Sequence, residues 1–324
     1  MAQRIYKLDN MKAVLIFLVV FGHAIEGHTE GFSHFLYTLI FVFHMPLFAF
    51  CSGFVARFDG GRICKKLLYC YLLFQLLHWL FDTLVLGESL ALQFTTPYWT
   101  LWYLLALAVW TLLLPLVERS TRRGRLTVLA VCVLAGLLAG YDATIDTTMS
   151  LSRILVFFPF FLLGHDLRQI APDAAPAVLR QRGVKLAAVG SVLAIALVCL
   201  IFQDDIMARW LFGSRSYSAA DYTALHRLLI YLAAFAFLIF ALCFTPERKT
   251  RLTFIGRNSL SIYLMHSFCL MLLEKWDFFT RFADPTLPSL AISVAIVLIF
   301  AAPPVANLVN KLAVWPGLWL PRKK

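Results

Sequence analysis

The chain has 324 residues, of which 61% are hydrophobic and only 15% are charged, and its mean hydropathy is +0.79. A soluble domain needs more polar surface than this composition supplies, so soluble globular proteins are excluded. The net charge of +11 does not indicate nucleic-acid binding, because Lys and Arg occur in short clusters between apolar runs. We expect an all-α, polytopic integral membrane protein.

About ten apolar segments are long enough to cross a bilayer, whose hydrocarbon core is about 30 Å thick. The first follows Arg4, Lys7 and Lys12 as in a signal peptide. No clean cleavage site comes after it, so we interpret it as a retained helix. The predicted spans cover residues 12–28, 34–55, 63–86, 99–117, 125–141, 150–168, 185–203, 222–245, 258–274 and 288–311.

The basic residues follow the positive-inside rule. If the N-terminus is cytoplasmic, most of the 29 Lys and Arg residues lie in alternate, inner segments. The outer exceptions are Arg209, Arg215, Lys275 and Arg281. The pattern predicts that both termini are cytoplasmic and that the protein crosses the cell membrane several times. The largest outer connection, about 204–221, is long enough to form a short lid.

No separate soluble domain is expected, because no connection is long enough to fold alone. We therefore expect one transmembrane domain over residues 1–324. The seven cysteines are an odd number and lie mostly inside apolar runs. Neither a disulfide framework nor a metal site follows from their spacing, so we interpret them as packing residues and expect no metal.

His23 lies inside the first apolar run, ten uncharged residues after Lys12. A helix rises 1.5 Å per residue, so His23 would lie about 16 Å beyond Lys12, near the bilayer midplane. Glu26 follows one turn later on the same face. Its carboxylate would either orient the imidazole as a general base or simply face outer solvent, and both interpretations stay open.

His44 and His266 also fall near mid-membrane. A single intramembrane histidine can be a buried residue bonded to a neighbouring helix, whereas three at similar depth favour a shared polar cavity. No two of them have the i, i+4 spacing of a metal site. Arg153 and Arg227 lie inside predicted spans, where topology gives no reason for a cation, so we expect both to face a cavity.

A second basic cluster, Arg62, Lys65 and Lys66, opens the third span. Together with Lys12 at the inner mouth, it would suit a polyanionic cytosolic ligand such as a nucleotide or coenzyme A. Positive-inside charge accounts for each of these residues equally well.

Small and aromatic residues complete the candidate cavity. Ser52, followed by a glycine, permits close helix contact in the second span. Trp102 and Tyr103 in the fourth span are typical of an interfacial aromatic belt, with a platform for sugar stacking as the alternative. Tyr263 precedes His266 in the ninth span, for which Asn258 is the predicted N-cap.

Several of these motifs occur in a familiar order. They are Asp9-x-x-Lys12 with ten residues to His23, Phe43-His44-Met45-Pro46 running to Ser52-Gly53-Phe54, the Arg62 cluster, Leu101-Trp102-Tyr103-Leu104, Arg153 ahead of residues 158–164, and Asn258 through His266. In this order the chain resembles the membrane acyltransferase family 3, within it the branch of fucose 4-O-acetylase-like and other cell-surface O-acetyltransferases. The resemblance covers nearly the whole chain, and ten helices is the family's usual number.

The resemblance implies transfer of an acyl group, usually acetyl, from cytosolic acyl-CoA to a hydroxyl at the outer face. Acyl-CoA would be a donor substrate rather than a tightly bound cofactor. The acceptor would be a surface glycan, a lipid-linked sugar or another small molecule. His23 matches the family's essential histidine, whereas Lys12 stands where many members have arginine.

The predicted mechanism assigns a role to each cluster. Lys12, Arg62, Lys65 and Lys66 would bind the phosphates of the coenzyme. His23 would either deprotonate the acceptor or relay the acyl group covalently. Arg153 or an aromatic hydrogen-bond donor would stabilise the oxyanion.

Two other classes of protein stay open. A secondary transporter with intramembrane His and Arg coupling residues predicts ion-driven uptake without acyl-CoA dependence. A non-catalytic membrane scaffold predicts that His23→Ala leaves function intact. The expected partners are acyl-CoA, a hydroxyl acceptor and the lipid bilayer, with a homo-oligomer compatible with the sequence.

Overall fold

The structure, a computed structural model, describes residues 4–27, 31–89, 91–118, 121–174 and 176–316, and every regular element within these ranges is helical. The longer helices are α1 (Tyr6–Ala24), α2 (Gly31–Val55), α4 (Tyr69–Phe81), α5 (Trp102–Glu118), α6 (Arg122–Leu138), α7 (Leu151–Ile170), α8 (Arg182–Ile201), α11 (Ala224–Phe244), α13 (Ser259–Lys275), α14 (Thr286–Ala301) and α15 (Pro303–Leu312). The shorter ones are α3 (Gly60–Arg62), α9 (Ala208–Leu211), α10 (Tyr217–Ala220) and α12 (Thr253–Arg257). π-helical turns over Ile63–Leu68 and Asp82–Leu86 continue α3 and α4.

Each predicted span coincides with a helix or a helix pair, but fewer than ten qualify as membrane spans by length and composition. Six helical segments of the described chain do so, or seven if α14 and α15, bent by 72° at their junction, count as one. Three charged residues in the first turns of α1 (Lys7, Asp9 and Lys12) make it too polar, and α5 and α13 have only 17 residues each. The protein is therefore all-helical and polytopic, with six or seven candidate spans.

The crossing of α2 and α7 forms the centre of the bundle. Gly53 of α2 faces the backbone of α7, where an added Cβ would lie 1.9 Å from the carbonyl oxygen of Phe161. Gly164 of α7 reciprocates, because its Cβ would lie 2.0 Å from the carbonyl oxygen of Phe50. The two glycines thus let the helix backbones touch, as the Ser52-Gly53 pair predicted.

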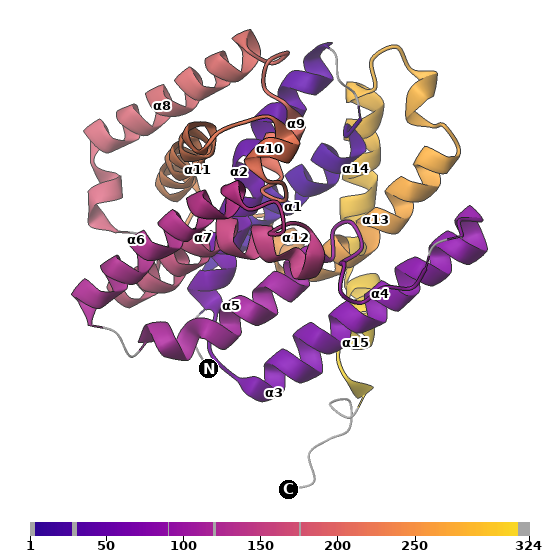
Figure 1. The fold of residues 1–324 in the computed structure, drawn as a ribbon, viewed down its shortest axis with the longest axis horizontal. Helices are drawn as coiled ribbons and strands as arrows, with labels where there is room; N and C mark the ends of the chain where they lie inside the picture. The colour runs from indigo at the N-terminus through magenta and orange to yellow at the C-terminus, as the bar shows by residue number, and fades with distance from the viewer. Residues whose placement is uncertain (1–3, 28–30, 90, 119–120, 175, 317–324) are drawn as a thin grey trace, which may run out of the picture.

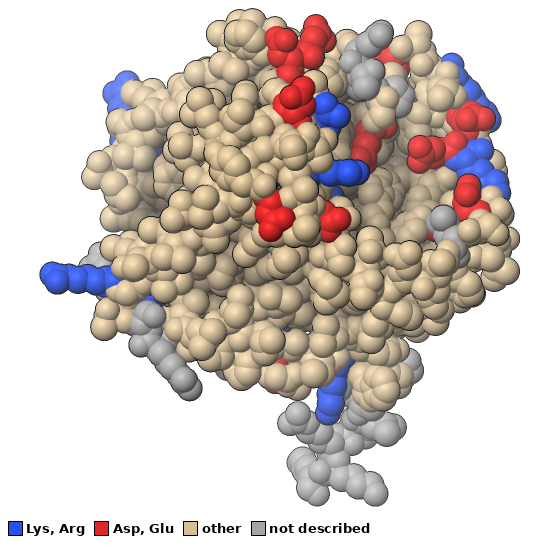
Figure 2. Space-filling model, viewed as in Figure 1, with Lys and Arg blue, Asp and Glu red and all other residues tan. Residues whose placement is uncertain are grey.

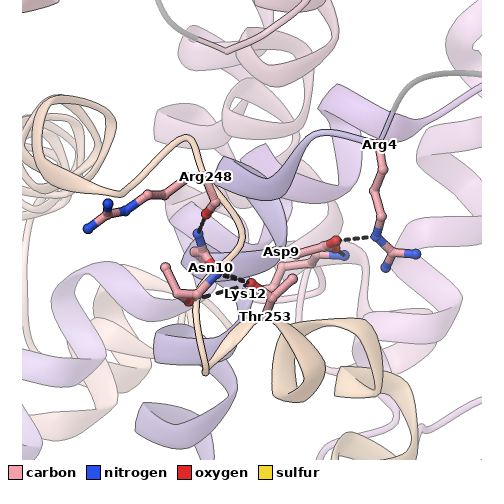
Figure 3. A network of polar contacts seen from close by, with 7 residues as sticks. Arg4, Asp9, Asn10, Lys12, Arg248 and Thr253 are labelled. Carbon is pink, nitrogen blue, oxygen red and sulfur yellow. Dashed lines mark hydrogen bonds and ion pairs between the residues drawn. The ribbon is translucent and has the colours of Figure 1, made fainter.

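The N-terminal end of α1 is fixed to the segment between α11 and α12, as Figure 3 shows. The Asn10 amide nitrogen donates to the carbonyl oxygens of Pro246 and Arg248, both at 2.9 Å. Its carbonyl oxygen accepts from the hydroxyls of Thr250 and Thr253, at 2.8 and 2.7 Å. Asn10 is buried, so these four bonds satisfy the hydrogen-bonding capacity of its amide.

The connection between α8 and α11 contains α9 and α10, which lie over the centre of the bundle in Figure 1. This connection is held at several points through its backbone and its side chains. The Ser152 hydroxyl donates to the carbonyl oxygen of Gly213 (2.8 Å), Tyr217 to that of Leu137 (2.7 Å), and the Trp210 indole to that of Ala220 (2.8 Å). This connection is therefore a wall packed against α6 and α7.

α13 begins after Asn258, the position predicted for its N-cap, but the side chain does not cap the helix. The Asn258 amide nitrogen instead donates to the carbonyl oxygen of Ala301, at 2.9 Å. This bond joins α13 to the bend between α14 and α15.

Candidate functional site

His23 is placed in the last turn of α1 and pairs with Glu26 just beyond the helix end. The distance from His23 Nδ1 to Glu26 Oε2 is 2.8 Å. An ionised carboxylate can only accept, so Nδ1 carries the proton and donates it to Glu26. The neutral ring then has Nε2 as its acceptor nitrogen, which is the arrangement of a general base.

Aromatic rings surround the His23 imidazole. The ring of Trp99 lies 4.9 Å from it, centroid to centroid, that of His266 5.6 Å and that of Phe41 5.7 Å. Trp99 has a φ of 23°, which an L-residue rarely adopts. The backbone before α5 thus holds the Trp99 indole against His23 in a strained conformation.

His44 and His266 both turn one ring nitrogen to the backbone of their own helix. His44 Nδ1 lies 2.9 Å from the carbonyl oxygen of Ile40, and His266 Nδ1 lies 2.7 Å from that of Tyr263. The buried Nε2 of His266 has no hydrogen-bond partner among the described residues. In the described part of the chain, no group of three or more His, Cys, Asp or Glu side chains is arranged to hold a metal ion.

Two cavities open beside His23 and share three lining residues, His23, Glu26 and Trp99. The first, of about 530 Å³, is also lined by Glu274 and Asp277, and we name it the acidic chamber. The second, of about 460 Å³, is also lined by Arg153, Arg209 and Arg215, and we name it the basic chamber. Figure 2 shows charged side chains of both signs around a hollow on this face. His23 is therefore accessible from two sides of opposite charge.

Arg153 lines the basic chamber, as its place inside a span predicted. Its Nε donates to the carbonyl oxygen of Phe212 at 3.2 Å, and its guanidinium lies 4.9 Å from the centroid of the Trp102 ring. Trp102 and His44 line the same chamber. The structure thus brings His23, Glu26, Arg153, His44 and Trp102 together, and His266 contacts His23 from behind.

Ser52, Tyr103 and Tyr263 lie between the chambers and a hollow at the C-terminal end of α2. The Ser52 hydroxyl is 2.7 Å from the Tyr103 hydroxyl, which donates to the carbonyl oxygen of Phe48. Tyr263 packs 6.2 Å from both the Tyr103 and the His266 rings. Ser52 also lines a small hollow of about 90 Å³ that contains Arg57 and Arg62. These side chains form a polar column from this hollow to the histidines.

The four predicted coenzyme-binding residues are not gathered in one pocket of the described structure. Arg62, Lys65 and Lys66 are exposed at the start of the third span. Lys12 lies on α1, where its Nζ is 3.1 Å from Asp9 Oδ1, and the other oxygen of Asp9 accepts from Arg4 (Figure 3). The Asp9-x-x-Lys12 motif therefore forms an ion pair within α1.

A larger hollow, of about 520 Å³, lies beside the Arg62 hollow and was missed by sequence reasoning. It is lined by Arg57, which borders both hollows, and by Arg168, His165 and Glu118. The sequence already groups Arg57 with Lys12 and the Arg62 cluster as cations that would suit a polyanionic ligand. It offers Arg168 only as positive-inside charge, because its position does not distinguish it from other loop cations.

Arg227, predicted to face a cavity, does not line either chamber. It is buried and donates to the carbonyl oxygens of Gly136 (2.8 Å) and Arg215 (3.0 Å) and to the Tyr222 hydroxyl. Burial raises the pKa of Tyr222, so this phenol stays protonated beside the guanidinium. Arg227 therefore anchors the connection that forms the wall of the basic chamber.

Comparison with known proteins identifies the family. The family model described as an acyltransferase domain, acyltransferase family 3, matches residues 5–306. The nodulation protein NolL of Sinorhizobium fredii (strain NBRC 101917 / NGR234) is 27% identical over 224 residues, which are 60% of this chain and 56% of the relative. This chain thus spans only about half the length of that relative, and no solved structure matches it significantly. Because the family model covers nearly the whole chain, the protein belongs to acyltransferase family 3.

Proposed function

We propose that the protein transfers an acyl group, acetyl in the first instance, from cytosolic acyl-CoA to a hydroxyl of an acceptor at the outer face of the cell membrane. In this proposal both termini are cytoplasmic. Family membership supports the transferase activity. The single observation that carries the assignment of the site is the His23–Glu26 pair of 2.8 Å, which borders both chambers.

In the proposed reaction, His23 Nε2 removes the proton of the acceptor hydroxyl. The alkoxide oxygen attacks the thioester carbonyl, the carbon–sulfur bond breaks, and the imidazolium returns its proton to the departing thiolate. Glu26 stabilises the imidazolium through its bond to Nδ1. The guanidinium of Arg153, in the same chamber, stabilises the negative charge that develops on the carbonyl oxygen.

The donor enters from the inner side in this proposal. Its phosphates bind the inner cations, including Arg57, Arg62 and Arg168 around the two hollows and Lys65 and Lys66 at the exposed start of the span. Its thioester arm follows the column of Ser52, Tyr103 and Tyr263 toward His23. Lys12, through its ion pair with Asp9, contributes positive charge beside this route.

The test is turnover of acetyl-CoA carrying a labelled acetyl group by purified protein in detergent, with small glycosides as acceptors. We expect His23→Ala to lower the rate by about 10²- to 10⁴-fold, the usual contribution of a general base. The matched control is His226→Gln, because His226 caps α11 and lines neither chamber. Equal turnover in wild type and His23→Ala would refute the proposal, and label retained on the protein would indicate the covalent relay instead.

A further inference from the structure

The outer cavity is divided by charge. Arg153, Arg209 and Arg215 border the basic chamber, whereas Glu274 and Asp277 border the acidic chamber on the other side of Trp99. Arg209 and Arg215 are exceptions to the positive-inside pattern, so membrane topology does not account for them. A concentration of cations on the disfavoured side of the protein points to a ligand.

The three arginines keep most of their charge available. Within the described residues none of them forms an ion pair. Arg209 donates to the carbonyl oxygen of Ala220, and Arg153 to that of Phe212. Glu26, which also borders the basic chamber, is engaged by His23. Three cations thus face one carboxylate that already has a partner.

Asp146 interacts electrostatically with Arg215, but its carboxylate accepts hydrogen bonds from Thr148. The backbone N–H and the hydroxyl of Thr148 lower the pKa of Asp146, and the N–H bond to its Oδ1 measures 2.7 Å. Asp146 lies beyond ion-pair distance of Arg215 in the described structure. The Arg215 guanidinium therefore remains exposed and free to bind an anion.

The wall that presents these cations is preorganised. The carbonyl oxygen of Arg215 accepts from Arg227 Nη2 at 3.0 Å and from the Tyr222 hydroxyl at 3.3 Å. Ser152 binds the backbone of the wall at Gly213, and Arg153 binds it at Phe212. All these bonds use backbone carbonyl oxygens of the connection. They therefore hold Arg215 in position without engaging its side chain. A preorganised cation loses less entropy when it binds a ligand.

We propose that the acceptor is an anionic sugar, either a sugar acid or a sugar phosphate, bound in the basic chamber. Its carboxylate or phosphate binds Arg209 and Arg215, and the hydroxyl to be acylated lies at His23. The inference rests on the proposed function, because it takes the ligand of this chamber to be the acceptor. Guanidinium groups bind carboxylate and phosphate in the same bidentate manner, so this chemistry covers both sources.

Size and charge support this occupant. A volume of about 460 Å³ lies in the range of small-molecule pockets. The Trp99 indole at the junction provides an apolar face for a sugar ring. The carboxylates of the acidic chamber would repel an anion, so charge alone directs the acceptor to one side of His23 and leaves the other side to a neutral or cationic group.

The experiment compares the binding of three probes to the full-length protein in detergent by calorimetry: methyl glucoside, methyl glucuronide and glucose 1-phosphate. We expect at least one anionic probe to bind about tenfold or more tightly than the neutral glucoside, as one charge-assisted guanidinium pair supplies. The glucuronide and the phosphate distinguish the two sources of the anion. Equal affinity for all three probes would overturn the proposal.

The variants locate the effect. Arg215→Gln should abolish most of the preference for the anion while leaving the fold intact, since only the backbone of Arg215 is bonded in the wall. Arg281→Gln is the matched control: an outer arginine that donates to the carbonyl oxygen of Trp276 and lines neither chamber. An unchanged preference in Arg215→Gln, or an equal loss in Arg281→Gln, would contradict the assignment.

The two proposals fail separately. Anion binding requires neither acyl-CoA nor His23, so His23→Ala should keep the preference for the anionic probe. If the wild-type protein binds the anion but does not consume acetyl-CoA, the proposed function fails and the site stands. If it consumes acetyl-CoA without preferring an anion, only the acceptor class is wrong.

Discussion

Glu26 accepts a hydrogen bond from His23 across the end of α1, with 2.8 Å between Oε2 and Nδ1. The two residues are three positions apart, but Glu26 lies beyond the last helical residue, Ala24. The turn at residues 25–27 thus brings the carboxylate back onto the imidazole. Of the two interpretations that the sequence left open, the structure shows the pairing, with Glu26 half-buried rather than fully exposed to solvent.

Glu26→Gln tests whether this pairing contributes to catalysis. Glutamine can still accept from Nδ1 but carries no charge to stabilise the imidazolium, so we expect kcat to fall about ten- to a hundredfold, less than for loss of the base itself. The rate of acetyl-CoA turnover, compared with that of His23→Ala at the same pH, measures this effect. Unchanged turnover in Glu26→Gln would show that the carboxylate takes no part in catalysis.

The sequence predicted much of this arrangement because spacing within one helix is a local property. The His23–Glu26 contact follows from a separation of three residues, and the helical segments follow from apolar runs. In the described chain only six or seven of the ten predicted spans have the length and composition of a membrane-crossing helix, because the charged turns of α1 and the shortness of α5 and α13 depend on where each helix begins and ends. Helix ends are the least predictable feature of a sequence.

Contacts between distant segments were not predictable in the same way. The sequence shows Arg227 as a cation inside a span, and only the fold reveals that Gly136 and Arg215 bring it two carbonyl acceptors. The sequence places Trp99 at the start of the fourth predicted span, and only the fold reveals that its backbone conformation turns it against His23. Neither relationship has a signature in local spacing.

Because the backbones of α2 and α7 touch, we expect a single methyl group added between them to lower the stability of the fold strongly. Gly53→Ala would place Cβ 1.9 Å from a backbone oxygen that cannot move independently of α7, so we expect strong destabilisation and poor recovery of folded protein. Gly190→Ala in α8 is the control, because nothing lies within 4 Å of its Cβ position. There we expect a gain of about 0.5–1 kcal/mol, as in an ordinary helix interior. Thermal unfolding in detergent should separate the two, and similar midpoints would contradict the close packing.

Asn10 predicts a loss of stability that is independent of the catalytic residues. Asn10→Ala removes four hydrogen bonds and leaves the hydroxyl of buried Thr253 without this acceptor, so we expect a loss of about 2–4 kcal/mol. Asn258→Ala removes one bond, to Ala301, and should cost about 1 kcal/mol. The measurement is again the thermal midpoint of each variant. Equal shifts would show that the Asn10 network is not what fixes α1.

Arg153 predicts a separation of kcat from KM. Two contacts orient its guanidinium in the chamber beside His23: the hydrogen bond to the Phe212 carbonyl oxygen and the stacking on the Trp102 ring. If it stabilises the oxyanion, Arg153→Gln should lower kcat by about 10²- to 10³-fold with little change in the KM for acetyl-CoA. Arg153→Lys keeps the charge but loses the planar fork, so it should recover only part of the rate.

The control is Arg209→Gln. Arg209 borders the same chamber on the wall, so its loss should raise the KM for an anionic acceptor more than it lowers kcat. If Arg153→Gln raised the KM for the anionic acceptor as Arg209→Gln does, Arg153 would be assigned to acceptor binding and not to stabilisation of the oxyanion.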